Sequence, residues 1–225
     1  MRNLLMVLVV GLGGVAVLLS LGTWQVQRLQ WKQEVLADIE ARIAADPVAL
    51  PDAPDPEADR YLPVQVTGVP GAPILQVLAS AKNIGAAHRL IVPFETEGGR
   101  RILVDLGFLR DGEPLPGLPP VLEVTGNLHW PDEVDGFTPE PDTRANLWFA
   151  RDVPRMAAAL DTEPLLVVRR SGTAIPGLLS MPVDTAGIPN DHFEYAVTWF
   201  GLAAIWLAMT GFLVYRMRKT PRGTT

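Results

Sequence analysis

Two long uncharged stretches, one near each end of the chain, constrain the fold more than any other feature of this 225-residue sequence. Residues 4–24 and residues 195–215 each run for 21 positions without Asp, Glu, Lys or Arg. A helix of about 20 apolar residues crosses the hydrocarbon core of a bilayer. The sequence therefore predicts a membrane protein with two transmembrane helices, at 4–24 and 195–215.

Charge is distributed unevenly around these two stretches. All 25 acidic residues lie within 34–194, whereas Arg2, Arg216, Arg218, Lys219 and Arg222 flank the outer ends. Cytoplasmic flanks of membrane segments carry an excess of Lys and Arg. We therefore expect a helical hairpin with cytoplasmic termini, residues 1–3 and 216–225, and a periplasmic domain at 25–194.

The N-terminal stretch also resembles a signal peptide, since Arg2 precedes an apolar run. The run is long, however, and no small-x-small cleavage site follows it, which favours an uncleaved anchor. An Arg-rich, Ser-rich amphipathic extension of the kind that directs import into organelles is not evident. We expect a multi-pass protein of the bacterial inner membrane.

The sequence pattern in the middle of the chain predicts an α+β domain. Good helix formers extend the first helix through 25–46, and four prolines make 47–56 a stiff linker. Short β-rich runs separated by turn residues predict a mainly antiparallel β sheet or barrel, with Gly98-Gly99 as a hairpin turn and Asp152 capping a short helix. The predicted strands are 61–69, 74–80, 89–96, 101–109 and 121–130, and 165–169 is a further β-type run.

Composition excludes several classes of function. The chain contains no cysteine, so it cannot attach c-type haem or build a thiolate zinc site. Three scattered histidines and the lack of nucleophile, phosphate-loop or dinucleotide motifs give no catalytic constellation, so we do not expect an enzyme. An acidic pI of about 5.1 argues against nucleic acid as a partner. His88 and His129 lie on predicted strands, and we expect them to be structural or surface residues.

The chemistry-bearing side chains gather at the outer ends of the two predicted membrane helices. Near the start of the second helix, helical spacing places His192, Tyr195 and Trp199 close to one face. Where the first helix leaves the membrane, Trp24 and Trp31 bracket Arg28, with Lys32 on the neighbouring face. One interpretation is an aromatic belt with snorkelling cations. The other is a haem site, with His192 as axial ligand, aromatic walls, and Arg28 and Lys32 as partners for the propionates.

Two motifs at these positions are similar to signatures of the Surfeit locus protein 1 family. They are Gly22-Thr-Trp-Gln-Val-Gln-Arg-Leu-Gln-Trp-Lys32 and Asn190-Asp-His-Phe-Glu-Tyr-Ala-Val-Thr-Trp-Phe200. The similarity continues through Gly85-Ala-Ala-His-Arg-Leu-Ile-Val-Pro-Phe94 and Asn146-Leu-Trp-Phe-Ala-Arg-Asp-Val-Pro-Arg-Met156. One segment departs from the family pattern: Val104-Asp-Leu-Gly-Phe-Leu-Arg110 has Leu106 where the family usually has Arg, which puts the contact of that arginine in doubt.

The resemblance implies a non-enzymatic assembly factor for cytochrome c oxidase, a haem-copper terminal oxidase. It implies haem a as the cofactor carried, bound between the two helices with His192 as its iron ligand, and delivery to oxidase subunit I. The expected partners are subunit I, a haem a synthase and membrane lipid. The alternative is a scaffold that stabilises nascent oxidase subunits without carrying haem.

Overall fold

The computed structural model describes residues 2–81 and 85–219, and the chain divides into two units. One unit contains residues 1–38 and 186–225, and the other contains residues 39–185. Met1 of the predicted N-terminal segment and residues 220–225 of the predicted C-terminal tail, including Arg222, lie outside the described residues.

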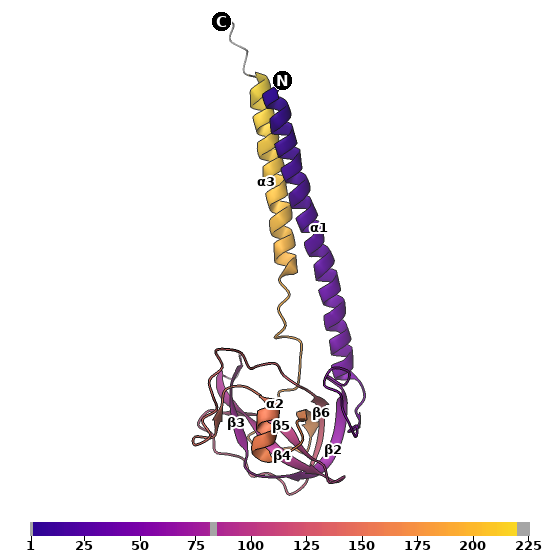
Figure 1. Cartoon of the computed structure of the whole chain (residues 1–225), viewed down its shortest axis with the longest axis vertical. Helices are drawn as coiled ribbons and strands as arrows, with labels where there is room; N and C mark the ends of the chain where they lie inside the picture. The colour runs from indigo at the N-terminus through magenta and orange to yellow at the C-terminus, as the bar shows by residue number, and fades with distance from the viewer. Residues whose placement is uncertain (1, 82–84, 220–225) are drawn as a thin grey trace. The chain divides into compact units, whose positions relative to one another are not determined.

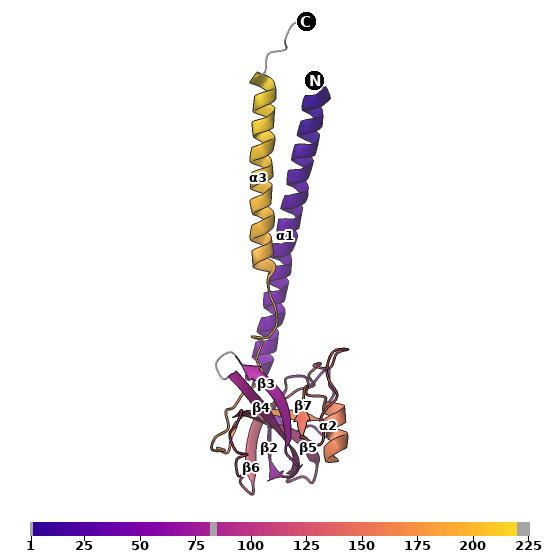
Figure 2. The same cartoon turned by 90° about the vertical axis from the view of Figure 1, so that its left-hand side faces the viewer.

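The first unit is a pair of antiparallel helices, which lie side by side in both views of the chain (Figures 1 and 2). Helix α1 spans Arg2–Ala44 and α3 spans His192–Lys219. Both are long and apolar enough to cross a membrane, and most of their apolar side chains are exposed in the isolated chain. These features are consistent with a membrane protein.

Small residues form the seam between the two helices. A Cβ added at Gly11 would lie 2.2 Å from Thr210 Cγ2, and one added at Gly22 would lie 2.8 Å from the ring of Phe200. On α3, Ala196 and Ala203 are buried. Close approach of helix backbones through Gly and Ala is the usual means of packing helices in lipid, where burial of apolar surface gives no driving force.

The second unit is a mixed β sheet that closes on itself. Strand β2 (Pro63–Pro70) pairs with both β6 (Leu122–Leu128) and β4 (Gly85–Thr96), so β2, β6, β8, β5 and β4 form a closed ring. The other two strands of the ring are β5 (Arg101–Arg110) and β8 (Leu166–Gly172). Beyond the ring, β3 (Leu75–Ala81) extends β4, the two-residue β7 (Leu147–Trp148) pairs with β3, and the two-residue β1 (Val48–Ala49) pairs with β2.

The expectation of a mainly antiparallel sheet is wrong, because three of these pairings are parallel: β1 with β2, β3 with β7, and β5 with β8. The last of these follows from the crossover through helix α2 (Val153–Leu160), which returns the chain to insert β8 between β6 and β5. The run predicted at 165–169 is therefore an interior strand. The proline-rich segment 47–56, expected to be a linker, also contributes β1 to the sheet.

Two apolar clusters stabilise this unit. The first fills the ring with inward side chains, among them Val64, Phe94 and Leu106. The second lies between the sheet and α2, where Met156 and Leu160 contact strand residues such as Ile91. Helix α2 begins as predicted, because the Asp152 side chain accepts a hydrogen bond from the Arg155 N–H and Pro154 occupies the first turn. In Figure 1, α2 lies in front of β4 and β5.

Candidate functional site

His192 is the first residue of α3, as the Asn190–Trp199 motif led us to expect. The Tyr195 N–H donates to the Asp191 carbonyl at 3.2 Å, which closes the first turn of the helix. Glu194 places a negative charge in that turn, where the helix dipole favours it. These local features hold His192 at a helix start, with its side chain half-buried against the first helix.

Gln25 is the partner of His192. The Nδ1 atom of His192 lies 2.8 Å from Oε1 of Gln25, across a separation of 167 residues in sequence. Gln25 is only 8% exposed and is one of three buried residues of α1, with Gly11 and Gly22. The pair is thus a polar contact at one end of a mainly apolar seam, and further along the seam the Trp206 Nε1–H donates to the Gly11 carbonyl at 3.0 Å.

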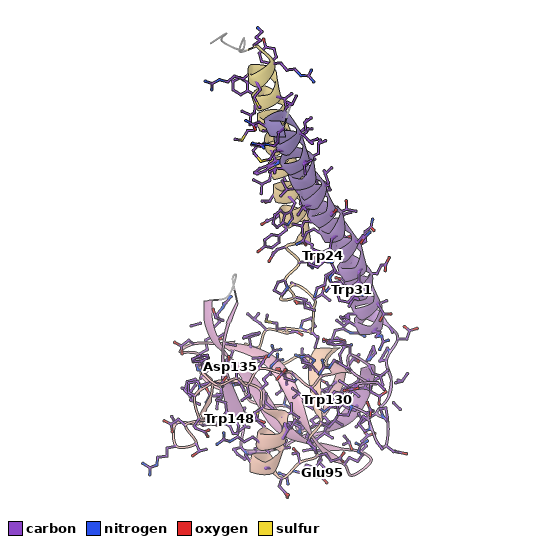
Figure 3. The ribbon with its side chains drawn as sticks, turned by 45° about the horizontal axis from the view of Figure 1, so that its top comes forward. Trp24, Trp31, Glu95, Trp130, Asp135 and Trp148 are labelled. Carbon is purple, nitrogen blue, oxygen red and sulfur yellow. The ribbon has the colours of Figure 1, made fainter. Side chains whose placement is uncertain are left out.

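The structure brings together only some of the predicted site residues. Trp199 is half-buried on α3, whereas Tyr195 is exposed. On α1, the Arg28 guanidinium stacks over Trp31 with 4.2 Å between its carbon and the ring centroid, so one of the two expected aromatic neighbours is in place. Trp24 is half-exposed and Lys32 is half-buried; Figure 3 shows Trp24 and Trp31 along α1.

The apolar cavity of the hairpin does not surround His192. A hollow of about 470 Å³ lies between the first turns of α1 and the last turns of α3. His192 is 14 residues from Trp206, which is about 21 Å along a helix. Three residues before Gln25 on α1 the seam is closed instead, since the Phe200 ring occupies the space beside Gly22. The cavity is lined by Met6, Val7, Val10, Gly11, Trp206, Met209, Thr210, Phe212 and Leu213.

A second concentration of charge lies inside the sheet unit. Asp105 is completely buried, with its Oδ2 atom 2.7 Å from Arg89 Nε and 3.7 Å from Arg151. Burial raises the pKa of Asp105, while both arginines and the Gly107 N–H oppose the rise. Arg151 also pairs with Glu133, whose pKa falls because that ion pair outweighs the effect of burial. The opposite charges are paired with one another, which favours a structural role for the cluster.

The two other histidines have different environments. His129 directly follows β6 rather than lying within it, and its ring stacks on Tyr61 with centroids 5.6 Å apart. Burial, with Arg151 and Arg60 nearby, lowers the pKa of His129 from 6.5 to about 4. His88 lies in β4, and its Nδ1 atom is 4.0 Å from an Asp111 carboxylate oxygen. Within 2–81 and 85–219, no three His, Asp or Glu side chains form a metal-binding group.

Gln25 is the site residue that reasoning from the sequence did not select. It belongs to the same motif as Arg28, and we expected it only to share a face with Lys32. The sequence does indicate which helix face Gln25 occupies. Gln25 is three residues after Gly22 and 14 after Gly11, which places all three on one helix face. Leu106, where the family pattern usually has Arg, is completely buried within the ring of strands.

Comparison with known proteins agrees with the motifs. A model of the SURF1 family matches residues 12–204. Surfeit locus protein 1 of Xenopus tropicalis is 30% identical over 209 residues, covering 82% of this chain and 68% of the relative. The human Surfeit locus protein 1 is 29% identical over 229 residues, with 90% and 75% covered, and a SURF1-like protein of Monosiga brevicollis is 30% identical over 214 residues, with 86% and 82% covered. The match extends over nearly all of the chain, which therefore belongs to the SURF1 family.

Proposed function

We propose that this protein is an assembly factor for a haem-copper terminal oxidase of the cytochrome c oxidase type, and that it acts without catalysing a reaction. In this proposal it holds haem a as cargo at the hairpin and helps deliver it to oxidase subunit I. We place it in the bacterial inner membrane, with both termini cytoplasmic and the sheet unit in the periplasm. A haem a synthase would be the donor that supplies the cargo.

The observation that best supports haem binding is the environment of His192. An axial ligand to haem iron is a neutral imidazole with one ring nitrogen held by a neighbouring group and the other directed at the metal. His192 has one nitrogen engaged by Gln25 and is half-buried at the start of an apolar helix. The residues present therefore fit a single protein ligand to haem iron.

The closed seam argues against the expected position of the haem between the two helices. Because Phe200 fills the space beside Gly22, we propose that the haem lies against the outer surface of the hairpin next to His192, not inside the seam. Exposed aromatic side chains, including Tyr195 and Trp24, supply apolar surface there. Arg28, held over Trp31, and Lys32 would neutralise the propionates.

The proposal is tested by expressing the full chain together with the enzymes of haem a biosynthesis and purifying it in detergent. We expect haem a to copurify with the wild-type chain and to be lost from His192→Ala, as measured by the absorbance spectrum and the ratio of haem to protein. His88→Ala is the matched control, since it removes a histidine of the sheet unit, and it should retain haem. Far-UV circular dichroism checks that each variant keeps its helices.

Two outcomes contradict the proposal in different ways. If His192→Ala keeps the same spectrum and stoichiometry, His192 is not the ligand. If the wild-type chain is colourless but still restores oxidase assembly in a strain that lacks it, the haem-independent scaffold is the correct function.

A further inference from the structure

Gln25 is a buried polar side chain in a seam that is built mainly from small and apolar residues. It is 8% exposed and follows Gly22 by less than one helical turn. A buried amide is costly unless its polar atoms form hydrogen bonds. In this hairpin the bond goes to one specific atom of the opposite helix, Nδ1 of His192.

The backbone geometry explains why the two side chains meet. The helices approach closely next to this pair. Gly22, three residues before Gln25, contacts the Phe200 ring, and Ala196 is buried one turn after His192. Small residues on both helices bring the backbones near enough for a glutamine side chain to reach the imidazole. The 2.8 Å separation is that of a good hydrogen bond.

The identity of the atoms determines where the imidazole proton lies. Oε1 of Gln25 is a carbonyl oxygen, which accepts hydrogen bonds and cannot donate them. With the amide in this orientation, Nδ1 of His192 is the donor and carries the proton. A neutral imidazole has only one N–H, so Nε2 is left with a free electron pair.

We propose that Gln25 is the positioning residue of the site: it fixes His192 in the Nδ1–H tautomer and fixes its ring orientation, so that Nε2 is presented as an electron-pair donor to a metal centre. This inference rests on the proposed function only in identifying that centre as haem iron. The tautomer itself is a property of the protein without any ligand.

The neutral amide also sets the strength of the ligand. A carboxylate partner would draw the Nδ1 proton more strongly and make the imidazole more basic, which tightens its bond to a metal. An amide accepts the same hydrogen bond without that charge. Gln25 thus orients His192 and leaves its bond to the metal weak enough to break, as a cargo carrier requires.

The tautomer is measured on the full chain without haem, in detergent micelles. Histidine labelled with ¹⁵N gives separate nitrogen signals for Nδ1–H and Nε2–H forms, and His192→Ala identifies which signals belong to residue 192. In the wild type we expect His192 to be protonated on Nδ1. In Gln25→Leu we expect the Nε2–H form to appear, because the acceptor is gone.

Gln27→Leu is the matched control, since it removes an exposed glutamine of the same helix two residues away. It should leave the His192 signals unchanged. A wild-type His192 protonated on Nε2, or signals that do not differ between wild type and Gln25→Leu with helix content preserved, would overturn the inference. Gln25→Glu keeps an acceptor oxygen in place and should retain the Nδ1–H form if the leucine variant proves unstable.

A second measurement uses the chain loaded with haem a by coexpression. We expect Gln25→Leu to bind haem about 10- to 100-fold more weakly, the usual cost of removing a group that supports a metal ligand. Gln25→Glu should lower the reduction potential of the iron and slow the release of haem. If His192→Ala retains haem, the proposed iron ligand is refuted and the tautomer result still stands. If His192→Ala loses haem but the reduction potential of Gln25→Glu equals that of the wild type, only the role of Gln25 is refuted.

Discussion

The stability of the sheet unit should depend on pH through His129. Burial and two nearby arginines lower the pKa of this histidine from 6.5 to about 4 in the folded chain. Between these two pH values the unfolded chain binds a proton that the folded chain does not. The free energy of unfolding must therefore fall as pH decreases through this window and be unaffected by His129 above it.

The size of the effect follows from the two pKa values. Each unit of difference corresponds to about 1.4 kcal/mol, so the full loss is about 3 kcal/mol below pH 4. At pH 5 the loss relative to pH 8 is about 2 kcal/mol, because the folded chain is still mostly unprotonated there. A change of this size is a large fraction of the stability of an ordinary domain.

His129→Phe is the informative variant, since it keeps an aromatic ring to stack on Tyr61 and removes the titrating group. Urea unfolding of the full chain in detergent, followed by fluorescence of Trp130 and Trp148 with the four helix tryptophans replaced by Phe, gives the free energy at each pH. Between pH 8 and pH 5 we expect the variant to lose about 2 kcal/mol less than the wild type. Tyr61→Phe keeps both the stack and the histidine and should retain the wild-type pH dependence. Equal losses in wild type and His129→Phe would refute the reasoning.

Two further predictions concern packing and charge. Asp105→Ala leaves Arg89 and Arg151 in a buried site without their shared carboxylate, so we expect the free energy of unfolding to fall by about 3–5 kcal/mol in the same urea assay; an unchanged midpoint would show that the arginines find other partners. Gly11→Val places a side chain against Thr210 and should force the seam apart at a cost of about 1–3 kcal/mol, seen as stronger quenching of Trp206 by brominated lipid. Gly13→Val, where an added Cβ meets nothing within 4 Å, is its control and should leave the quenching unchanged.

The strands of the sheet unit were largely predictable, whereas their order was not. Alternation and turn residues located β2 to β6 to within a few residues, and the Asp152 cap located α2, because these are local properties of the sequence. The closure of β2 onto β4 and the insertion of β8 beside β5 join segments far apart in the chain. Such pairings depend on which strand edges remain open after the others have paired, which local patterns do not record.

The environment of Leu106 could not be predicted from the sequence either, for a different reason. From the family pattern alone, its replacement of an arginine left open both an internal contact and a surface for a partner. In this structure its side chain is completely buried among the residues that fill the ring, so in this chain the position serves the core. The sequence could not reveal this, because Ile102–Leu109 of β5 are buried at every position and the usual alternation of inward and outward side chains is lost.

The site at the hairpin shows what a search for chemically conspicuous residues omits. His192 was found because it is a histidine above an apolar helix, and Arg28 because it is a cation between aromatics. Gln25 is neither charged nor aromatic, and its importance is visible only once the contact face of α1 is known. Gly11 and Gly22 lie on that face, and Gln25, three residues after Gly22, lies on it too. A buried polar residue on this face is costly unless its polar atoms form hydrogen bonds, and the partner of Gln25 is His192 on the opposite helix. The glycines alone do not select this face, because Gly13 lies off it with nothing within 4 Å of an added Cβ, so the pairing of Gln25 with His192 required the structure.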